Sequence, residues 1–172
     1  NCFENCTSLK SFAYKGIKSI SIGSEAFHGC CALGIISLTE CSIVSFNEGC
    51  LSHISKLNQL CVESDEILFG NNMVSCCPSL ANINLVSTQS FTISSNAFQG
   101  CLPLTDITLM SQSSIQLSKK CFICANNLKI ASIEGHQIIV EDEVFKSLKK
   151  LQSITFSCDE LKIGNSVFGF CS

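Results

Sequence analysis

Hydrophobic residues return along this chain at a nearly fixed interval. One apolar residue, which we call the anchor, recurs every 23 or 24 residues. Its eight occurrences are Phe3, Phe27, Leu51, Val74, Phe98, Phe122, Phe145 and Phe168. A fixed period of this length is typical of a repeat protein in which each repeat forms one coil. The spacing therefore predicts about seven coils of 23–24 residues.

Further apolar columns keep the same phase in every coil. A leucine follows six residues after each of the first seven anchors, at Leu9, Leu33, Leu57, Leu80, Leu104, Leu128 and Leu151. Apolar residues also stand nine and eleven residues after the anchor, as Ile83 and Leu85 do. Another such pair, for example Phe91 and Ile93, precedes the next anchor by seven and five residues. Because alternate residues of a strand share one face, each coil is expected to contain two short strands.

The residues around each anchor resemble one turn of a helix. In the segment 24–30, Ser24 is suited to cap a helix and Glu25 would lie in its first turn. The equivalent segment 141–146 begins with acidic residues and ends on Lys146, which is again the helical order of charge. No stretch shows ten residues of helical period with caps at both ends. We therefore expect a one-turn helix in each coil and no long helix.

A coil of this length cannot bury its own apolar columns, whereas stacked coils bury the columns of their neighbours. We therefore expect one mostly-β solenoid domain over residues 1–172, with Leu80 packed between Leu57 and Leu104. Solenoids normally close their ends with polar caps. Neither end of this sequence shows one, which leaves two alternatives. The chain is a segment of a longer array, or a second copy covers its ends by self-association.

Charge and hydropathy argue against nucleic-acid binding and against a membrane-spanning helix. The net charge is −3, and all eleven basic residues are lysines. Arginine is the usual residue for bidentate contacts with phosphate and guanine, so nucleic acid is not an expected partner. The longest unbroken apolar run is 121–125, whereas a membrane-spanning helix needs about 20 such residues. We therefore expect no membrane span in this chain.

Most of the 14 cysteines fall on columns of the repeat. In other coils these columns hold Ala, Val, Ile or Leu, so the sequence predicts buried thiols that act as small hydrophobic residues. A disulfide between neighbouring coils, as between Cys6 and Cys30, is the alternative. The column cysteines lie three residues after an anchor (Cys6, Cys30, Cys77, Cys101, Cys171) or directly before one (Cys2, Cys50, Cys121).

Candidate chemistry is sparse. Cys121 and Cys124 form one C-x-x-C, which is typical of a redox pair or half a zinc site, but no second ligand pair accompanies it. His28, His53 and His136 differ in phase and in coil, so we do not expect them to converge. The acidic run 141–143 is either a metal or partner site or, as we expect, a solvated helix start. The sequence thus predicts no enzyme, no metal site and no cofactor.

Two segments carry a family resemblance. The pattern I-x-I-G-S-E-A-F-H-G-C-x-x-L at 20–33 resembles the leucine-rich repeat of the BspA-like, or Treponema pallidum, type. The segment F-T-I-S-S-N-A-F-Q-G-C-L-P-L-T-D-I-T-L at 91–109 is similar to it. The resemblance covers nearly the whole chain and implies a leucine-rich-repeat solenoid whose L-x-x-I-x-L strands line a concave face. It also implies a surface-displayed binding or adhesion protein, since members of this family resemble one another in that role.

The expected function is therefore non-catalytic binding of a protein or extracellular-matrix ligand through the concave face, at the cell surface or outside the cell. An intracellular, cytoplasmic interaction scaffold of the same fold is the alternative. The outward side chains of two adjacent coils give the sharpest candidate, because an apolar pair is rimmed by polar groups there. The alternative for this patch is a strand face that simply carries residues suited to strands. The candidate patch consists of Asn82, Asn84, Val86, Asp106, Thr108 and Met110.

Overall fold

The alternating apolar columns form parallel strands, as their period requires. The computed structural model describes residues 2–75 and 77–171, and residues 1, 76 and 172 lie outside this description. The strands of the described part are Ser11–Lys15 (β1), Ile20–Ile22 (β2), Ile35–Phe46 (β3), Gln59–Phe69 (β4), Asn82–Ile93 (β5), Asp106–Ser111 (β6), Ser114–Leu117 (β7), Ile130–Glu134 (β8), Gln137–Val140 (β9), Ser153–Ser157 (β10) and Glu160–Ile163 (β11).

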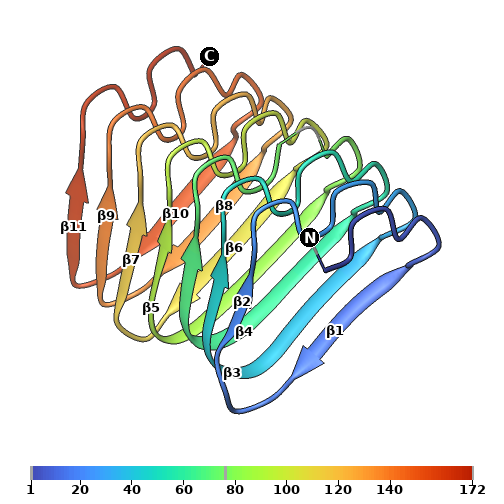
Figure 1. Cartoon of the computed structure of the whole chain (residues 1–172). Helices are drawn as coiled ribbons and strands as arrows, with labels where there is room; N and C mark the ends of the chain where they lie inside the picture. The colour runs from blue at the N-terminus through green and yellow to red at the C-terminus, as the bar shows by residue number, and fades with distance from the viewer. Residues whose placement is uncertain (1, 76, 172) are drawn as a thin grey trace.

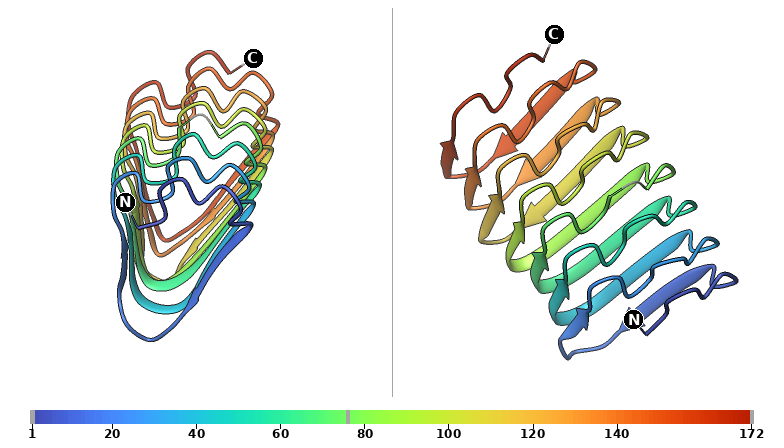
Figure 2. Two further views of the ribbon diagram at one scale, coloured as in Figure 1. Left: turned by 45° about the vertical axis from the view of Figure 1, so that its right-hand side comes forward. Right: turned by 45° about the horizontal axis from the view of Figure 1, so that its top comes forward.

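The strands build two parallel walls that meet at a corner. The first ladder runs in the order β1-β3-β4-β5-β6-β8-β10. The second ladder contains β2, the later halves of β3, β4 and β5, and then β7, β9 and β11. The strands β3, β4 and β5 are long because each bends through the corner and belongs to both walls (Figure 1). Figure 2 shows the walls as two sides of a V, closed at the wide end by irregular turns.

The core lies between the two walls, where the predicted columns meet. The leucine column is fully buried at Leu33, Leu57, Leu80, Leu104 and Leu128. The predicted strand columns are buried in the same way, with Leu85 and Ile93 at 0% exposure. The structure thus confirms a mostly-β solenoid, but the two short strands predicted for each coil are one continuous strand in β3, β4 and β5.

The outermost coils differ from the equal coils that the spacing predicts. Leu9 and Leu151, in the leucine column, are only half-buried and pack at the edge of the core. The strand β11 is exposed at all four positions. The reason is that β1 and β10 each pair with a single neighbour in the first ladder, so only one side of these coils is covered.

The predicted helical turn is wrong. Segment 24–30 is a chain of turns, and none of the described residues lies in a helix. The backbone explains the difference, because Glu25 has φ of 54° and Gly29 has φ of 75°. Two left-handed residues within five positions prevent a right-handed helical turn. Accordingly, the described part of the chain contains no helix long and apolar enough to cross a membrane.

A buried serine column closes the corner between the walls. Ser64, Ser87 and Ser111 are all buried, and each hydroxyl donates to a backbone carbonyl of the preceding coil. For Ser87 the acceptor is the Asp65 carbonyl oxygen at 2.6 Å. These bonds satisfy carbonyls that the bend removes from the strand ladder. The corner therefore has a defined structure, although its sequence varies from coil to coil.

Candidate functional site

The structure brings the six residues of the candidate patch onto two neighbouring strands. In the register of β5 and β6, Asn82 pairs with Asp106, Asn84 with Thr108 and Val86 with Met110. These residues alternate with the buried Ile83 and Leu85 and their partners, so they stand on the outer face of the first ladder. The patch is therefore a contiguous block two residues wide and three deep.

The exposure of these side chains suits contact with another molecule. Met110 is 38% exposed, and Val86 beside it is half-buried. Asn82 and Asn84 are exposed, and the Asp106 carboxylate accepts a hydrogen bond from the Thr105 hydroxyl at 2.6 Å. The patch thus offers amide and carboxylate groups beside an apolar pair, which is the composition of many interface centres and rims.

A groove that sequence analysis missed begins at this apolar pair. It has a volume of about 630 Å³ and follows the corner toward the C-terminal coils. It is lined by Val86, Met110, Glu134 and His136, together with corner residues that include Gly135. The groove extends from two coils of 24 residues onto two that are one residue shorter, with 23 residues from Phe122 to Phe145 and 23 from Phe145 to Phe168.

Gly135 lines the groove and stands where a side chain would meet the buried Ile115 on the inner side of the bend. It occupies the corner position that Ser111 holds in the preceding coil, and a side chain there would project into the bend. A Cβ atom on Gly135 would lie 3.3 Å from Ile115 Cδ1 and 3.5 Å from the Ser111 carbonyl oxygen. The 23-residue spacings were visible in the sequence. The sequence did not show where in these coils the missing residue falls, because the apolar columns do not cross the corner.

Most charged groups around the corner are already paired. His136 Nδ1 lies 2.5 Å from Asp159 Oδ2, and Lys15 Nζ lies 2.8 Å from Glu40 Oε1. The hydrogen bond and the charge of Glu40 raise the pKa of the Lys15 amine, and the charge of Glu63 adds to this effect. The side chains that remain without a hydrogen bond or ion pair among the described residues include Glu63 and Glu134.

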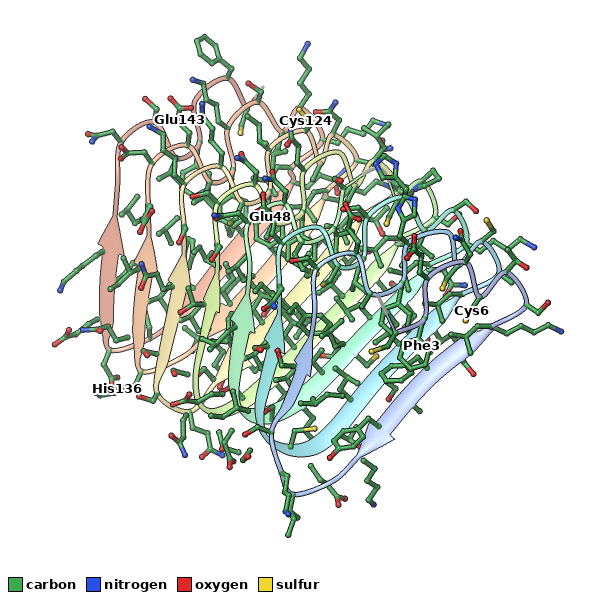
Figure 3. The ribbon with its side chains drawn as sticks, in the orientation of Figure 1. Phe3, Cys6, Glu48, Cys124, His136 and Glu143 are labelled. Carbon is green, nitrogen blue, oxygen red and sulfur yellow. The ribbon has the colours of Figure 1, made fainter. Side chains whose placement is uncertain are left out.

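The three histidines are placed differently from the prediction. The rings of His28 and His53 lie 6.5 Å apart at 75°, so the expectation that no histidines converge is wrong for this pair. They follow consecutive anchors by one and two residues, and this one-residue offset is small enough for neighbouring coils to bring the rings together. His136 lies at the corner, whereas Glu48, Cys124 and Glu143 lie on the turn side (Figure 3).

The C-x-x-C residues point in different directions. Cys121 is fully buried and Cys124 is exposed with φ of 66°, so their thiols do not face one another as a redox pair requires. Burial raises the pKa of the Cys121 thiol well above its usual value, and burial raises that of Cys50 to about 12. Cys30 donates its thiol hydrogen to the Phe3 carbonyl oxygen at 3.0 Å. Cys30, Cys50 and Cys121 act as packing groups, because burial suppresses the reactive thiolate. The predicted burial is wrong for Cys2 and Cys6, which are exposed.

The acidic run 141–143 is engaged within the protein. Glu141 accepts from the Gln116 amide at 3.0 Å, and Asp142 accepts from the Asn165 backbone amide at 2.6 Å. Glu143 lies 3.1 Å from Lys146 and 3.3 Å from Lys120, and the hydrogen bond from Lys146 is the main cause of its lowered pKa. The run joins neighbouring coils, and the residues that the structure describes contain no group of three or more side chains able to hold a metal ion.

Comparison with known proteins gives a consistent picture of the fold. A leucine-rich repeat protein from Bacteroides ovatus ATCC 8483 has a similar structure, with a TM-score of 0.51 and 18% sequence identity. The similarity covers 98% of this chain and 48% of the Bacteroides chain, so this chain spans about half the length of that protein. A search of curated proteins found no match.

The family model for the BspA type leucine rich repeat region matches residues 1–92 and 75–172. It finds six copies, which is fewer than the seven coils that the anchor spacing predicts. The prediction of seven coils is therefore not supported, and the chain holds about six turns of the repeat. The match extends over both halves of the sequence. The chain therefore belongs to the BspA-type leucine-rich repeat family.

Proposed function

We propose that this chain is a non-catalytic protein-binding module that works as one solenoid domain. The binding surface in this proposal is the outer face of the first ladder, centred on the candidate patch. This is the face of the L-x-x-I-x-L strands, which the family resemblance implies to be concave. Leucine-rich repeat proteins in general bind other proteins, and stacked repeats provide the extended, rigid surface that such binding uses. The function thus rests on a surface rather than on reactive side chains.

The observation that carries the proposal is the exposed pair Val86–Met110 beside exposed amides. Met110 remains 38% exposed on a strand whose alternate residues are buried. Methionine adapts its shape to a partner, and exposed apolar groups rimmed by polar ones mark interaction sites. Asn82 and Asn84 supply hydrogen-bond donors and acceptors without a net charge.

The test compares two charged double variants of the purified chain. Asn84→Arg with Met110→Lys places cations on the patch, whereas Thr92→Arg with Ser114→Lys places the same charges on the second ladder of the same coils. Binding to a panel of purified extracellular-matrix and cell-surface proteins is measured by biolayer interferometry. We expect at least a tenfold weaker Kd, equivalent to about 1.4 kcal/mol, for the patch variant only. Equal affinities of the two variants for every bound protein would remove the patch from the proposal.

We further propose that the chain is displayed at the cell surface and used for adhesion or ligand capture. This location is supported only by the resemblance to surface-displayed family members, so it needs its own experiment. Antibody staining of intact source cells is compared with staining of permeabilised cells. Signal on intact cells supports adhesion. Signal that requires permeabilisation would replace this proposal by an intracellular interaction scaffold.

A further inference from the structure

Four residues form a straight row on the first ladder, next to the corner. Glu63 pairs with Val86, Val86 with Met110 and Met110 with Glu134 in successive strand pairings. Neighbouring strands lie about 4.8 Å apart, so the two glutamates are separated by about 14 Å along the solenoid axis. The row thus has a carboxylate at each end and an apolar pair in the middle.

The side chains of both glutamates are open to a partner, whereas three neighbouring acids of the corner are engaged within the protein. Glu40, the ion-pair partner of Lys15, raises the pKa of the Lys15 amine, and the charge of Glu63 also raises it. Asp159 is paired with His136, and Glu40 with Lys15. Asp65 accepts a hydrogen bond from the Thr88 hydroxyl at 2.5 Å. The side chains of Glu63 and Glu134 are exposed and form no hydrogen bond or ion pair within the described part of the chain.

Two hollows border this row. The groove of about 630 Å³ borders Val86, Met110 and Glu134. A second hollow of about 200 Å³ borders Glu63, and Thr88 lines both. An elongated ligand that follows the row therefore meets two adjacent hollows, one beside Glu63 and one beside Glu134.

We propose that this row binds an extended peptide segment in which two basic residues stand four positions apart with an apolar residue midway between them. In an extended chain, residues i, i+2 and i+4 point to one face, and four residues span about 13 Å. The basic side chains then reach Glu63 and Glu134, and the apolar side chain covers Val86 and Met110. This inference rests on the proposed protein-binding function and specifies the chemistry of the partner.

The spacing gives the peptide its specificity. A basic residue at i+2 would lie over Val86 and Met110 and leave one glutamate without a partner. Exposed ion pairs are individually weak and are screened by salt. We therefore expect modest affinity that depends on both glutamates together and decreases as ionic strength increases.

The test uses the fluorescein-labelled peptide Gly-Lys-Ser-Leu-Ser-Lys-Gly and the isomer Gly-Ser-Lys-Leu-Lys-Ser-Gly, titrated with the whole chain by fluorescence anisotropy. We expect the first peptide to bind about tenfold more tightly at 50 mM salt, and this preference to be lost in Glu63→Gln with Glu134→Gln. Glu25→Gln, an exposed acid on the turn side, is the matched control and should keep the preference. Circular dichroism verifies that each variant is folded.

The outcomes separate this inference from the proposed function. Equal affinity for the two peptides, or an unchanged preference in the double glutamine variant, would overturn the peptide proposal. If the patch variant then still loses affinity for a matrix or cell-surface protein, the protein-binding function stands without it. If the first peptide binds more tightly as expected and no protein of the panel binds, the peptide proposal is supported. The panel then did not contain the protein partner.

Discussion

At the scale of the residue, each of the central coils places one phenylalanine ring in the same part of the core. Most coils take the ring from the anchor, and the rings of Phe98 and Phe122 stack at 5.3 Å. Where the anchor is Leu51 or Val74, the ring comes from five residues earlier in the chain. The supplied rings are Phe46 and Phe69, which lie 4.9 Å apart, and Phe69 contacts Phe98 edge-on at 5.7 Å.

Because the ring comes either from the anchor or from the residue five positions before it, we expect substitutions at these two positions to be strongly coupled. Leu51→Phe adds a second ring to a filled, fully buried site and should lower the free energy of unfolding by about 1–3 kcal/mol. Combining it with Phe46→Leu should recover at least about 1 kcal/mol relative to the sum of the single effects. Urea unfolding of the four proteins measures this cycle. Phe46→Leu with Leu128→Phe, in a distant coil, is the control and should be additive. If the changes in the free energy of unfolding were additive in both cycles, the two positions would not share the site of one ring.

At the scale of the element, the turn segments repeat a backbone geometry that the apolar pattern does not reveal. A residue with positive φ stands two positions before the anchor, as Glu25 and Asn96 do, and another stands two positions after it, as Gly29 and Gly100 do. Only glycine and asparagine signal this conformation in a sequence. Glu25, Lys120 and similar residues conceal it, because they are good helix formers. The sequence therefore predicts the strands, because side-chain burial determines their apolar pattern. It does not predict the turns, because backbone sterics determine their geometry.

The turn geometry makes Glu25 a site for stabilisation. Its φ is 54°, its side chain is exposed, and glycine adopts this conformation without the strain from Cβ. Glu25→Gly should increase the free energy of unfolding by up to about 1 kcal/mol, since the relief of strain exceeds the added entropy of the unfolded chain. Thermal and urea unfolding measure the change. Ser24→Gly, at the neighbouring residue with ordinary φ, should destabilise slightly. A loss of stability in Glu25→Gly would refute this account of the turn.

At the scale of the whole molecule, stacking decides which features are visible in the sequence. Columns that face the core repeat because each must fit the coils on both sides, so their register could be predicted throughout. The outer face carries no such constraint. The Val86–Met110 pair was nevertheless predictable, since strand alternation places both side chains outward on adjacent coils. The corner groove was not predictable, because its lining depends on the path of the backbone at the bend, which the apolar columns do not reach.

Stacking also predicts that the stability lost on truncating a core leucine depends on the position of its coil along the solenoid axis. Leu80 is completely buried in a central coil, whereas Leu151 is half-buried near the end. Leu80→Ala should cost about 2–5 kcal/mol because neighbouring coils hold the cavity open, and Leu151→Ala should cost clearly less because that edge can relax. Since each coil contacts only its neighbours, hydrogen exchange in Leu80→Ala should rise most in β4, β5 and β6 and least in β10 and β11. Equal costs of unfolding for the two variants, with uniform loss of protection, would show that the coils do not behave as a stack of neighbours.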